Sequence, residues 1–269
     1  MFGFQAYKSA LEWHIDNGVN EALLETQNLG ISEVQTLRSP DSGGSIVLPL
    51  GKNDARAEAE KIAAQVNTLE ELKAAIAAFD GIALKKTATT MVFSDGNPNA
   101  SIMLVGEAPD ADEDRQGTPF VGATGPLLDK ILGCIGLSRT DEDSARAVYI
   151  SNILNWRPPG NRTPSPAEIE VSLPFIEKHI ALVRPKLLIL CGGIPAQALL
   201  QTEQSVSRLR GRWHEYRPSS EFLKLSTGTI PAIVTYHPGS LLRTPAQKRS
   251  VWQDMLSLQA KFMEIDIKT

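Results

Sequence analysis

Four side chains of this 269-residue chain are of types that could carry out acid–base or recognition chemistry. They are Glu107, Phe120, Asn152 and His237. Glu107 follows the apolar run SIMLVG at 101–106, where a carboxylate could act as a general base or position a water. His237 opens the loop HPGSLLR, where a neutral imidazole could donate a hydrogen bond to a leaving-group oxygen. Because a lone histidine is more often structural, His237 by itself decides nothing.

The other two side chains suit recognition of a flat ring. Phe120 lies between Pro119 and Val121 in a loop, and its ring could stack on a planar ligand. Core packing is the competing interpretation, and it is favoured when Phe120 is considered alone. Asn152 lies near the end of the apolar run AVYISNIL. Its amide offers both a donor and an acceptor and could read the edge of a nucleobase, although an asparagine that caps a turn fits equally well.

Several other kinds of catalytic site are disfavoured by the motifs that are missing. The loop GEAPDADEDRQGTPFVG at 106–122 has neither GxGxxG nor GxxxxGK[ST], which disfavours a dinucleotide or P-loop site. The chain has no GxSxG nucleophile elbow. Its 2 cysteines and 4 histidines form no metal-ligand spacing, so we expect no metal.

The elements that must position these residues alternate between strand and helix from about residue 100. Apolar runs predict strands at 101–106, 147–154, 186–192 and 231–238, with helices at about 125–136, 164–183, after 195 and at 245–264. This order predicts an α/β fold with three αβα layers and a parallel four-stranded central sheet. In such sheets ligands bind beyond the carboxyl ends of the strands, which is where Glu107, Asn152 and His237 fall.

The leading part of the chain has a different character. Its expected elements are helices at 4–28 and 53–66, a Ser-, Gly- and Pro-rich linker at 38–52, and a helix behind a capping box of Thr68 and Glu71. We therefore expect a helical N-terminal extension with a linker over residues 1–75 and the α/β domain over residues 76–269. The extension contains no group of residues that suggests chemistry.

Composition and charge limit the surroundings and partners of the chain. No stretch approaches the roughly 20 apolar residues of a membrane helix, and the N-terminus is not a secretory signal. We expect a cytoplasmic monomer without a membrane partner. The formal net charge of −4 disfavours a nonspecific nucleic-acid binder. Residues 144–167 and 222–253 nevertheless contain no acid and could lie against a phosphate backbone, the alternative being scatter of surface charge.

Four separated segments resemble the motif series of the family 4 uracil-DNA glycosylases. They are GEAPDADEDRQGTPFVG, ISNILNWRPPGNRTPSPAEI, LRGRW and TYHPGSLLRTPAQKR, in this order within about residues 79–262. The resemblance implies a monofunctional enzyme of base excision repair. Such an enzyme flips uracil out of single- or double-stranded DNA and hydrolyses its N-glycosidic bond, leaving an abasic site.

The resemblance also assigns roles to residues. It gives catalytic roles to Glu107 and His237. It gives base binding to Gly106, Ala108, Asp110, Phe120 and Asn152. It gives DNA contacts to Arg157, Arg162, Arg210, Arg212, Ser240, Arg243 and Lys248.

Two departures distinguish this chain from the family it resembles. Typical members bind a 4Fe–4S cluster through four cysteines, and the aligned residues here are Phe79, Ile82, Trp156 and Ser172. We therefore expect no cofactor and no iron–sulfur cluster, with apolar groups filling the space. Where the family has GEAPG or GEGPG, this chain has GEAPD. Asp110 therefore adds negative charge near the expected base site.

These departures keep open a second function, that of a catalytically silent relative that binds damaged or single-stranded DNA. A hydrolase of free nucleosides or nucleotides is a third. The basic, Pro-rich loops disfavour it, because a small substrate would not need them.

Overall fold

The computed structural model describes residues 52–220, 222–223 and 228–264. The predicted helix at 4–28 and all but the last residue of the predicted linker at 38–52 lie outside this range. No helix among the described residues is both long enough and apolar enough to cross a membrane.

A mixed six-stranded sheet runs through the domain in the order β1-β3-β2-β4-β6-β5. The strands are β1 (Asp95–Gly96), β2 (Ile102–Gly106), β3 (Val148–Asn152), β4 (Leu187–Cys191), β5 (Trp213–Tyr216) and β6 (Ile230–Thr235). The four predicted strands are its parallel centre, β3-β2-β4-β6. The sheet is larger than the predicted parallel four-stranded one, because β1 and β5 extend this centre at the two edges by antiparallel pairing. Neither edge strand was predicted from the sequence, because β1 has only two residues and β5 is only partly buried.

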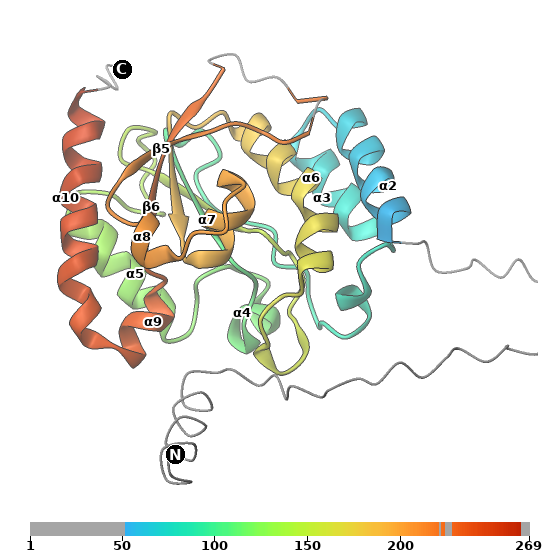
Figure 1. Cartoon of the computed structure of the whole chain (residues 1–269), viewed down its shortest axis with the longest axis horizontal. Coiled ribbons are helices and arrows are strands. Elements are labelled where there is room, and N and C mark those ends of the chain that lie inside the picture. Colours follow the sequence, from blue (N-terminus) through green and yellow to red (C-terminus); the bar gives the residue numbers. More distant parts are fainter. Residues whose placement is uncertain (1–51, 221, 224–227, 265–269) are drawn as a thin grey trace, which may run out of the picture. The chain divides into compact units, whose positions relative to one another are not determined.

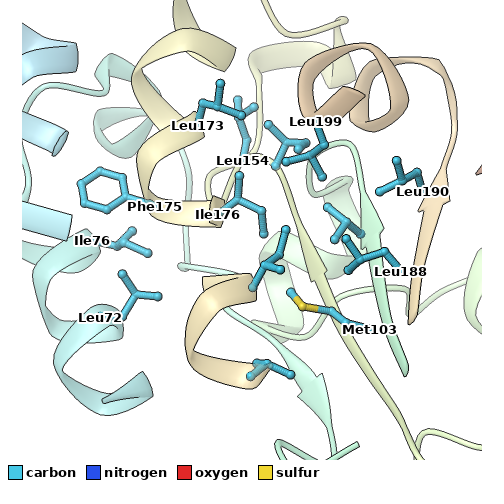
Figure 2. Close-up of a cluster of buried hydrophobic side chains, with 14 of the residues drawn as sticks. Leu72, Ile76, Met103, Leu154, Leu173, Phe175, Ile176, Leu188, Leu190 and Leu199 are labelled. Carbon is cyan, nitrogen blue, oxygen red and sulfur yellow. The ribbon is translucent and has the colours of Figure 1, made fainter. Parts of the chain in front are cut away.

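Helices cover both faces of the sheet and give the predicted three layers (Figure 1). One face carries α5 (Thr124–Gly133) and α10 (Lys248–Glu264), and the other carries α2 (Lys52–Gln65), α3 (Leu69–Ala78), α6 (Pro166–Val183) and α7 (Gly193–Leu200). Ile102 and Leu104 of β2 pack on the α5 side, whereas Met103 and Val105 pack on the α6 side. Figure 2 shows part of the α6-side core. Because each central strand is buried on both faces, it reads as a continuous apolar run.

Short helical segments complete the described part of the domain. They are α4 (Ala111–Gln116), α8 (Val206–Leu209), α9 (Pro238–Arg243) and the 3₁₀ turns η1 (Ala83–Lys86), η2 (Pro159–Asn161) and η3 (Pro245–Gln247). Ser165 caps α6 ahead of Pro166, as the sequence predicts. Helices α2 and α3 bury apolar side chains in the same core as α6. Residues 52–75 thus share the core of the α/β domain, and the boundary at residue 75 remains a prediction.

The strand order places the candidate site. The chain passes from β2 through α5 to β3 on one side, and from β3 through α6 to β4 on the other side of β2. Connections therefore diverge next to β2, and the crevice beyond the carboxyl ends at such a point is the usual ligand site of an open α/β sheet. In Figure 1, α4, α9 and the loop between β3 and α6 lie along this edge.

Candidate functional site

The carboxyl ends of β2 and β3 meet at Gly106 and Asn152, which are register partners. The N–H of Ile153 donates to the carbonyl of Gly106 at 2.9 Å, so the pairing continues past the strands. The Asn152 side chain is buried, and its Nδ2 has no hydrogen-bond partner among the described residues. A buried amide donor without a partner is costly. An acceptor on a ligand would satisfy it.

The ring of Phe120 lies against the same strand end. Its centroid is 5.1 Å from that of the His237 ring, with 33° between the two planes. A Cβ on Gly106 would stand 2.2 Å from Asn152 Oδ1 and 2.7 Å from Cζ of Phe120. Only glycine lets both side chains approach the end of β2 so closely. The structure therefore brings Gly106, Phe120, Asn152 and His237 together, although they come from three separate motifs.

The protonation state of His237 follows from its surroundings. Its Nδ1 accepts a hydrogen bond from the N–H of Gly239 at 3.1 Å, so in the neutral ring the proton lies on Nε2. Burial and, to a smaller extent, the positive charge of Arg243 lower the pKa of His237, and Asp110 opposes both, so that its pKa is about 4. At neutral pH the ring is therefore an uncharged Nε2–H donor.

Glu107 and Arg243 influence each other across the site. Burial raises the pKa of Glu107, and the charge of Arg243 opposes this rise. Glu107 forms no side-chain hydrogen bond or ion pair within the described part of the chain. A partly buried carboxylate with a raised pKa is a stronger base than an exposed one, which suits proton transfer.

Asp110 caps α4 and is linked to Phe120 through Glu113. Its Oδ1 accepts from the N–H of Asp112 at 2.9 Å and from that of Glu113 at 3.0 Å. Glu113 Oε2 accepts in return from the N–H of Asp110 at 2.6 Å, and Glu113 Oε1 accepts from the N–H of Phe120. Glu113 was not predicted from the sequence, although an N-cap Asp followed three residues later by Glu is the signature of this capping box. Ala108 is partly buried against the α6-side core.

Comparison with known proteins decides the family. A profile of the uracil DNA glycosylase superfamily matches residues 93–256. The chain belongs to the uracil DNA glycosylase superfamily.

Its relatives include enzymes named type-4 uracil-DNA glycosylases. The one from Pyrobaculum aerophilum is 34% identical over 191 residues, covering 70% of this chain and 91% of the relative. The one from Archaeoglobus fulgidus is 36% identical over 175 residues, covering 64% and 81%. The one from Sulfurisphaera tokodaii is 29% identical over 199 residues, covering 72% and 84%. Glu107, Phe120, Asn152 and His237 all lie inside the segment that matches the superfamily profile.

Two of the predicted DNA-contacting arginines of this superfamily member are engaged within the chain. Arg210 forms an ion pair with the fully buried Asp254 and donates to the carbonyl of Ser250 at 2.7 Å. Arg162 makes two hydrogen bonds to Glu168, at 2.9 and 2.6 Å, which hold the pKa of that carboxyl at about 2. Both guanidinium groups therefore already have a carboxylate partner.

The other predicted DNA contacts are freer. Arg212, Arg243 and Lys248 are exposed and form no ion pair within the described residues. Arg157 donates through Nε to Asn161 at 2.7 Å, and its Nη1 forms a long ion pair with the buried Asp114 at 4.0 Å. Ser240 lies in α9, where its hydroxyl donates to the carbonyl of His237 at 2.8 Å. Leu242, beside Arg243, is 48% exposed, so α9 presents an apolar and a basic side chain together.

The positions that align with the family's cluster cysteines are buried on the α6 side. They are Phe79, Ile82, Trp156 and Ser172. The Phe79 ring makes an edge contact with that of Phe175, with centroids 5.2 Å apart. Cys191 belongs to the core on the other face of the sheet, and Cys134 is exposed beside α10. These residues do not fit an iron–sulfur cluster, which needs thiolates. The described residues contain no group of three or more His, Cys, Asp or Glu side chains suited to a metal.

Proposed function

We propose that this chain is a monofunctional uracil-DNA glycosylase of base excision repair. The convergence of Phe120, Asn152 and His237 around Gly106 carries the proposal, in a superfamily whose type-4 members match most of the chain. A ring for stacking, an amide for a base edge and a neutral donor for an oxygen are the groups that a flipped uracil requires.

The proposed reaction is hydrolysis of the N-glycosidic bond. The bonding electrons leave with the base, so uracil departs as an anion while positive charge develops on the sugar. The Nε2–H of His237 and the amide of Asn152 stabilise the anion through hydrogen bonds that are oriented in advance. Water attacks the sugar carbon, and Glu107 positions that water and accepts its proton. The products are an abasic site and uracil, which is protonated as it leaves.

The proposed partner is uracil-containing DNA, bound along the edge formed by α9 and the loop between β3 and α6. Arg243, Arg212, Lys248 and Arg157 are the cations that we assign to its phosphates, together with Ser240. Arg210 is left out, because its Nε and Nη2 already donate to Asp254 and to the carbonyl of Ser250. Arg162 contributes less than a free arginine, because Glu168 balances its charge. Cytoplasmic residence and a monomeric state remain predictions from the sequence.

We further propose that the chain folds without an iron–sulfur cluster, since none of the four aligned positions holds a cysteine and three of them hold large apolar side chains. Anaerobically purified protein should be colourless and contain no stoichiometric iron. Roughly four iron atoms per chain with visible absorbance would overturn this.

The function is tested with an oligonucleotide that contains one uracil, followed by alkaline cleavage of abasic sites. We expect cleavage at the uracil by the wild type and a large loss in His237→Asn. An identical strand with thymine controls for nuclease contamination. Binding of the uracil strand without any cleavage would instead support the silent, DNA-binding relative.

A further inference from the structure

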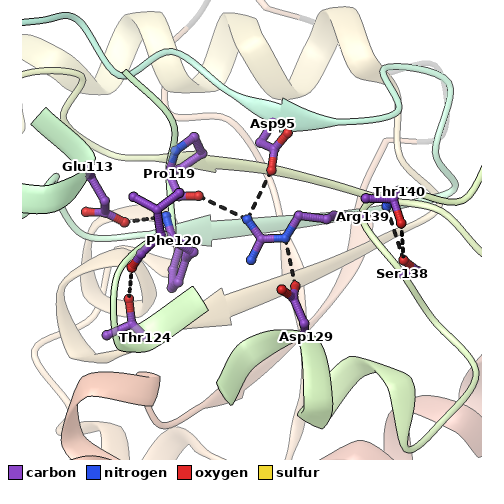
Figure 3. A network of polar contacts seen from close by, with 10 residues as sticks. Asp95, Glu113, Pro119, Phe120, Thr124, Asp129, Ser138, Arg139 and Thr140 are labelled. Carbon is purple, nitrogen blue, oxygen red and sulfur yellow. Dashed lines mark hydrogen bonds and ion pairs between the residues drawn. The ribbon is translucent and has the colours of Figure 1, made fainter. Parts of the chain in front are cut away.

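One peptide unit beside the site is held at both of its polar ends by charged side chains (Figure 3). Arg139 Nη1 donates to the carbonyl of Pro119 at 3.1 Å, and Glu113 Oε1 accepts from the N–H of Phe120. That carbonyl and that N–H belong to the same planar peptide. With both its carbonyl and its N–H held, this peptide unit cannot rotate. The direction of the Cα–Cβ bond of Phe120, and with it the position of the ring, is therefore fixed.

The backbone of Phe120 needs such anchoring. Its φ is +50°, in the left-handed region that a residue with a Cβ rarely adopts. Such a conformation persists only where the surroundings determine it. A Cβ on Gly125 would stand 2.4 Å from the carbonyl oxygen of Phe120, so the chain also packs closely on the other side.

The two anchors are themselves fixed by the fold. Arg139 has a side chain that is only 9% exposed, and it pairs with Asp95 of β1 at 3.0 Å and with Asp129 of α5 at 2.8 Å. Both carboxylates remain partly exposed, so water can solvate them when Arg139 is replaced. Glu113 is buried, and its two oxygens accept from the N–H groups of Asp110 and Phe120.

We infer that Glu113 and Arg139 are positioning residues that hold the Phe120 ring in place to stack on the flipped base. The inference rests on the proposed function for the identity of that base. Neither residue needs to touch the substrate, because both act through one peptide plane.

Glu113 serves this role in its ionised form, which predominates only above its folded pKa of about 7. Burial and the charge of Asp110 raise the pKa of Glu113, whereas the N–H groups of Asp110 and Phe120 and the charge of Arg139 oppose the rise, so that its pKa is about 7. The ionised carboxylate accepts both N–H groups strongly, whereas protonation turns one oxygen into an O–H group that is a donor and only a weak acceptor. Glu113→Gln therefore removes one acceptor while it keeps the shape of the side chain.

The test combines Glu113→Gln and Arg139→Gln with Phe120→Ala. A matched control is Glu71→Gln, because Glu71 occupies the equivalent position in α3 and accepts from the N–H of Asn67 at 2.6 Å. We call the two contacts of Glu113 and Arg139 to the 119–120 peptide unit the clamp. Amide hydrogen exchange at Phe120 measures how firmly the clamp holds this peptide, without any need for activity. Single-turnover release of uracil measures its consequence, and Arg139→Lys tests rescue by a side chain that can still donate to the Pro119 carbonyl.

We expect Glu113→Gln to accelerate exchange at Phe120 and to slow uracil release, each roughly 10- to 100-fold, the worth of one charge-assisted hydrogen bond. In the Phe120→Ala background the same change should have no further effect on the rate, because its target ring is gone. Glu71→Gln should change neither quantity, and Arg139→Lys should recover part of the loss in Arg139→Gln.

Additive rate effects of Glu113→Gln and Phe120→Ala would overturn the inference, as would unchanged exchange at Phe120. If the wild type released no uracil, the proposed function would fail. The clamp would then be decided by exchange alone.

Discussion

His237 has two tasks that a pair of substitutions can separate. Its Nδ1 caps α9 by accepting from the N–H of Gly239, and its Nε2–H is the donor that we assign to the departing uracil. His237→Asn keeps a residue that caps helices well but removes that donor, whereas His237→Ala removes both. The rate of uracil release should therefore fall by the same factor in both variants, whereas only His237→Ala should be less stable than the wild type.

The size of each effect follows from the kind of contact removed. Loss of one preoriented donor to a developing anion costs about 2–4 kcal/mol, or roughly 30- to 1000-fold in the rate of uracil release. Loss of a helix cap costs about 1 kcal/mol, or about 2–4 °C in Tm for a domain of this size, and should be seen only in His237→Ala. Affinity for uracil-free DNA should barely change, because the contact forms only with a flipped base.

Single-turnover kinetics with excess enzyme, thermal melts and titration of uracil-free duplex provide these three measurements. A His237→Asn rate within about threefold of the wild type would refute the assignment. A rate loss matched by an equal loss of affinity for uracil-free DNA would also refute it, since His237 would then act in binding rather than in bond breaking.

The pH dependence of stability gives an independent check on His237. Its pKa in the folded chain, about 4, lies below its ordinary value of 6.5. Its contribution to stability is thus present above pH 6.5 and lost as the pH falls towards 4, by about 3 kcal/mol at most. Urea melts of the wild type and His237→Asn should therefore diverge over this window, with the wild type becoming the less stable as the pH falls. A constant difference would mean that the ring is not buried in its neutral form.

Four further predictions concern charged residues around the site. Asp110→Asn keeps the cap of α4 and removes a charge beside the developing anion, so it should release uracil faster than the wild type. It should also be faster than Asp110→Gly, which loses the side-chain acceptor as well. A slower rate in Asp110→Asn than in the wild type would show that Asp110 assists the reaction. The folded pKa of Glu113, about 7, is raised from 4.5, so the stabilising contribution of its protonated form is present below pH 4.5 and lost as the pH rises through 7. Urea melts should show the wild type losing up to about 3 kcal/mol relative to Glu113→Gln across that range. A difference that does not vary with pH would contradict this. Arg243→Ala should weaken binding to all DNA sequences alike and reduce the salt dependence of binding by about one unit of slope, and an unchanged slope would place the DNA elsewhere. Arg210→Ala should instead lower Tm, because it leaves Asp254 buried without its cation.

The sequence by itself determined the centre of the sheet and the places of the main motifs. Strands that are buried on both faces must be continuous apolar runs, and all four parallel strands were predicted for that reason. The start of α6 was predicted because Ser165 and Pro166 are local signals that need no tertiary contact. The edge strands β1 and β5 were not, since a two-residue strand and a partly exposed one leave no apolar pattern.

Only the tertiary structure decided what individual polar and aromatic side chains do. Arg210 is an ion-pair partner rather than a free cation because a residue 44 positions away, Asp254, is buried beside it. Phe120, for which core packing was the favoured interpretation in isolation, is both buried and in contact with His237. Its left-handed backbone is held by Glu113 and by Arg139, whose bond to the carbonyl of Pro119 spans 20 positions. Such contacts depend on which surfaces the fold brings together, and local sequence carries no record of them.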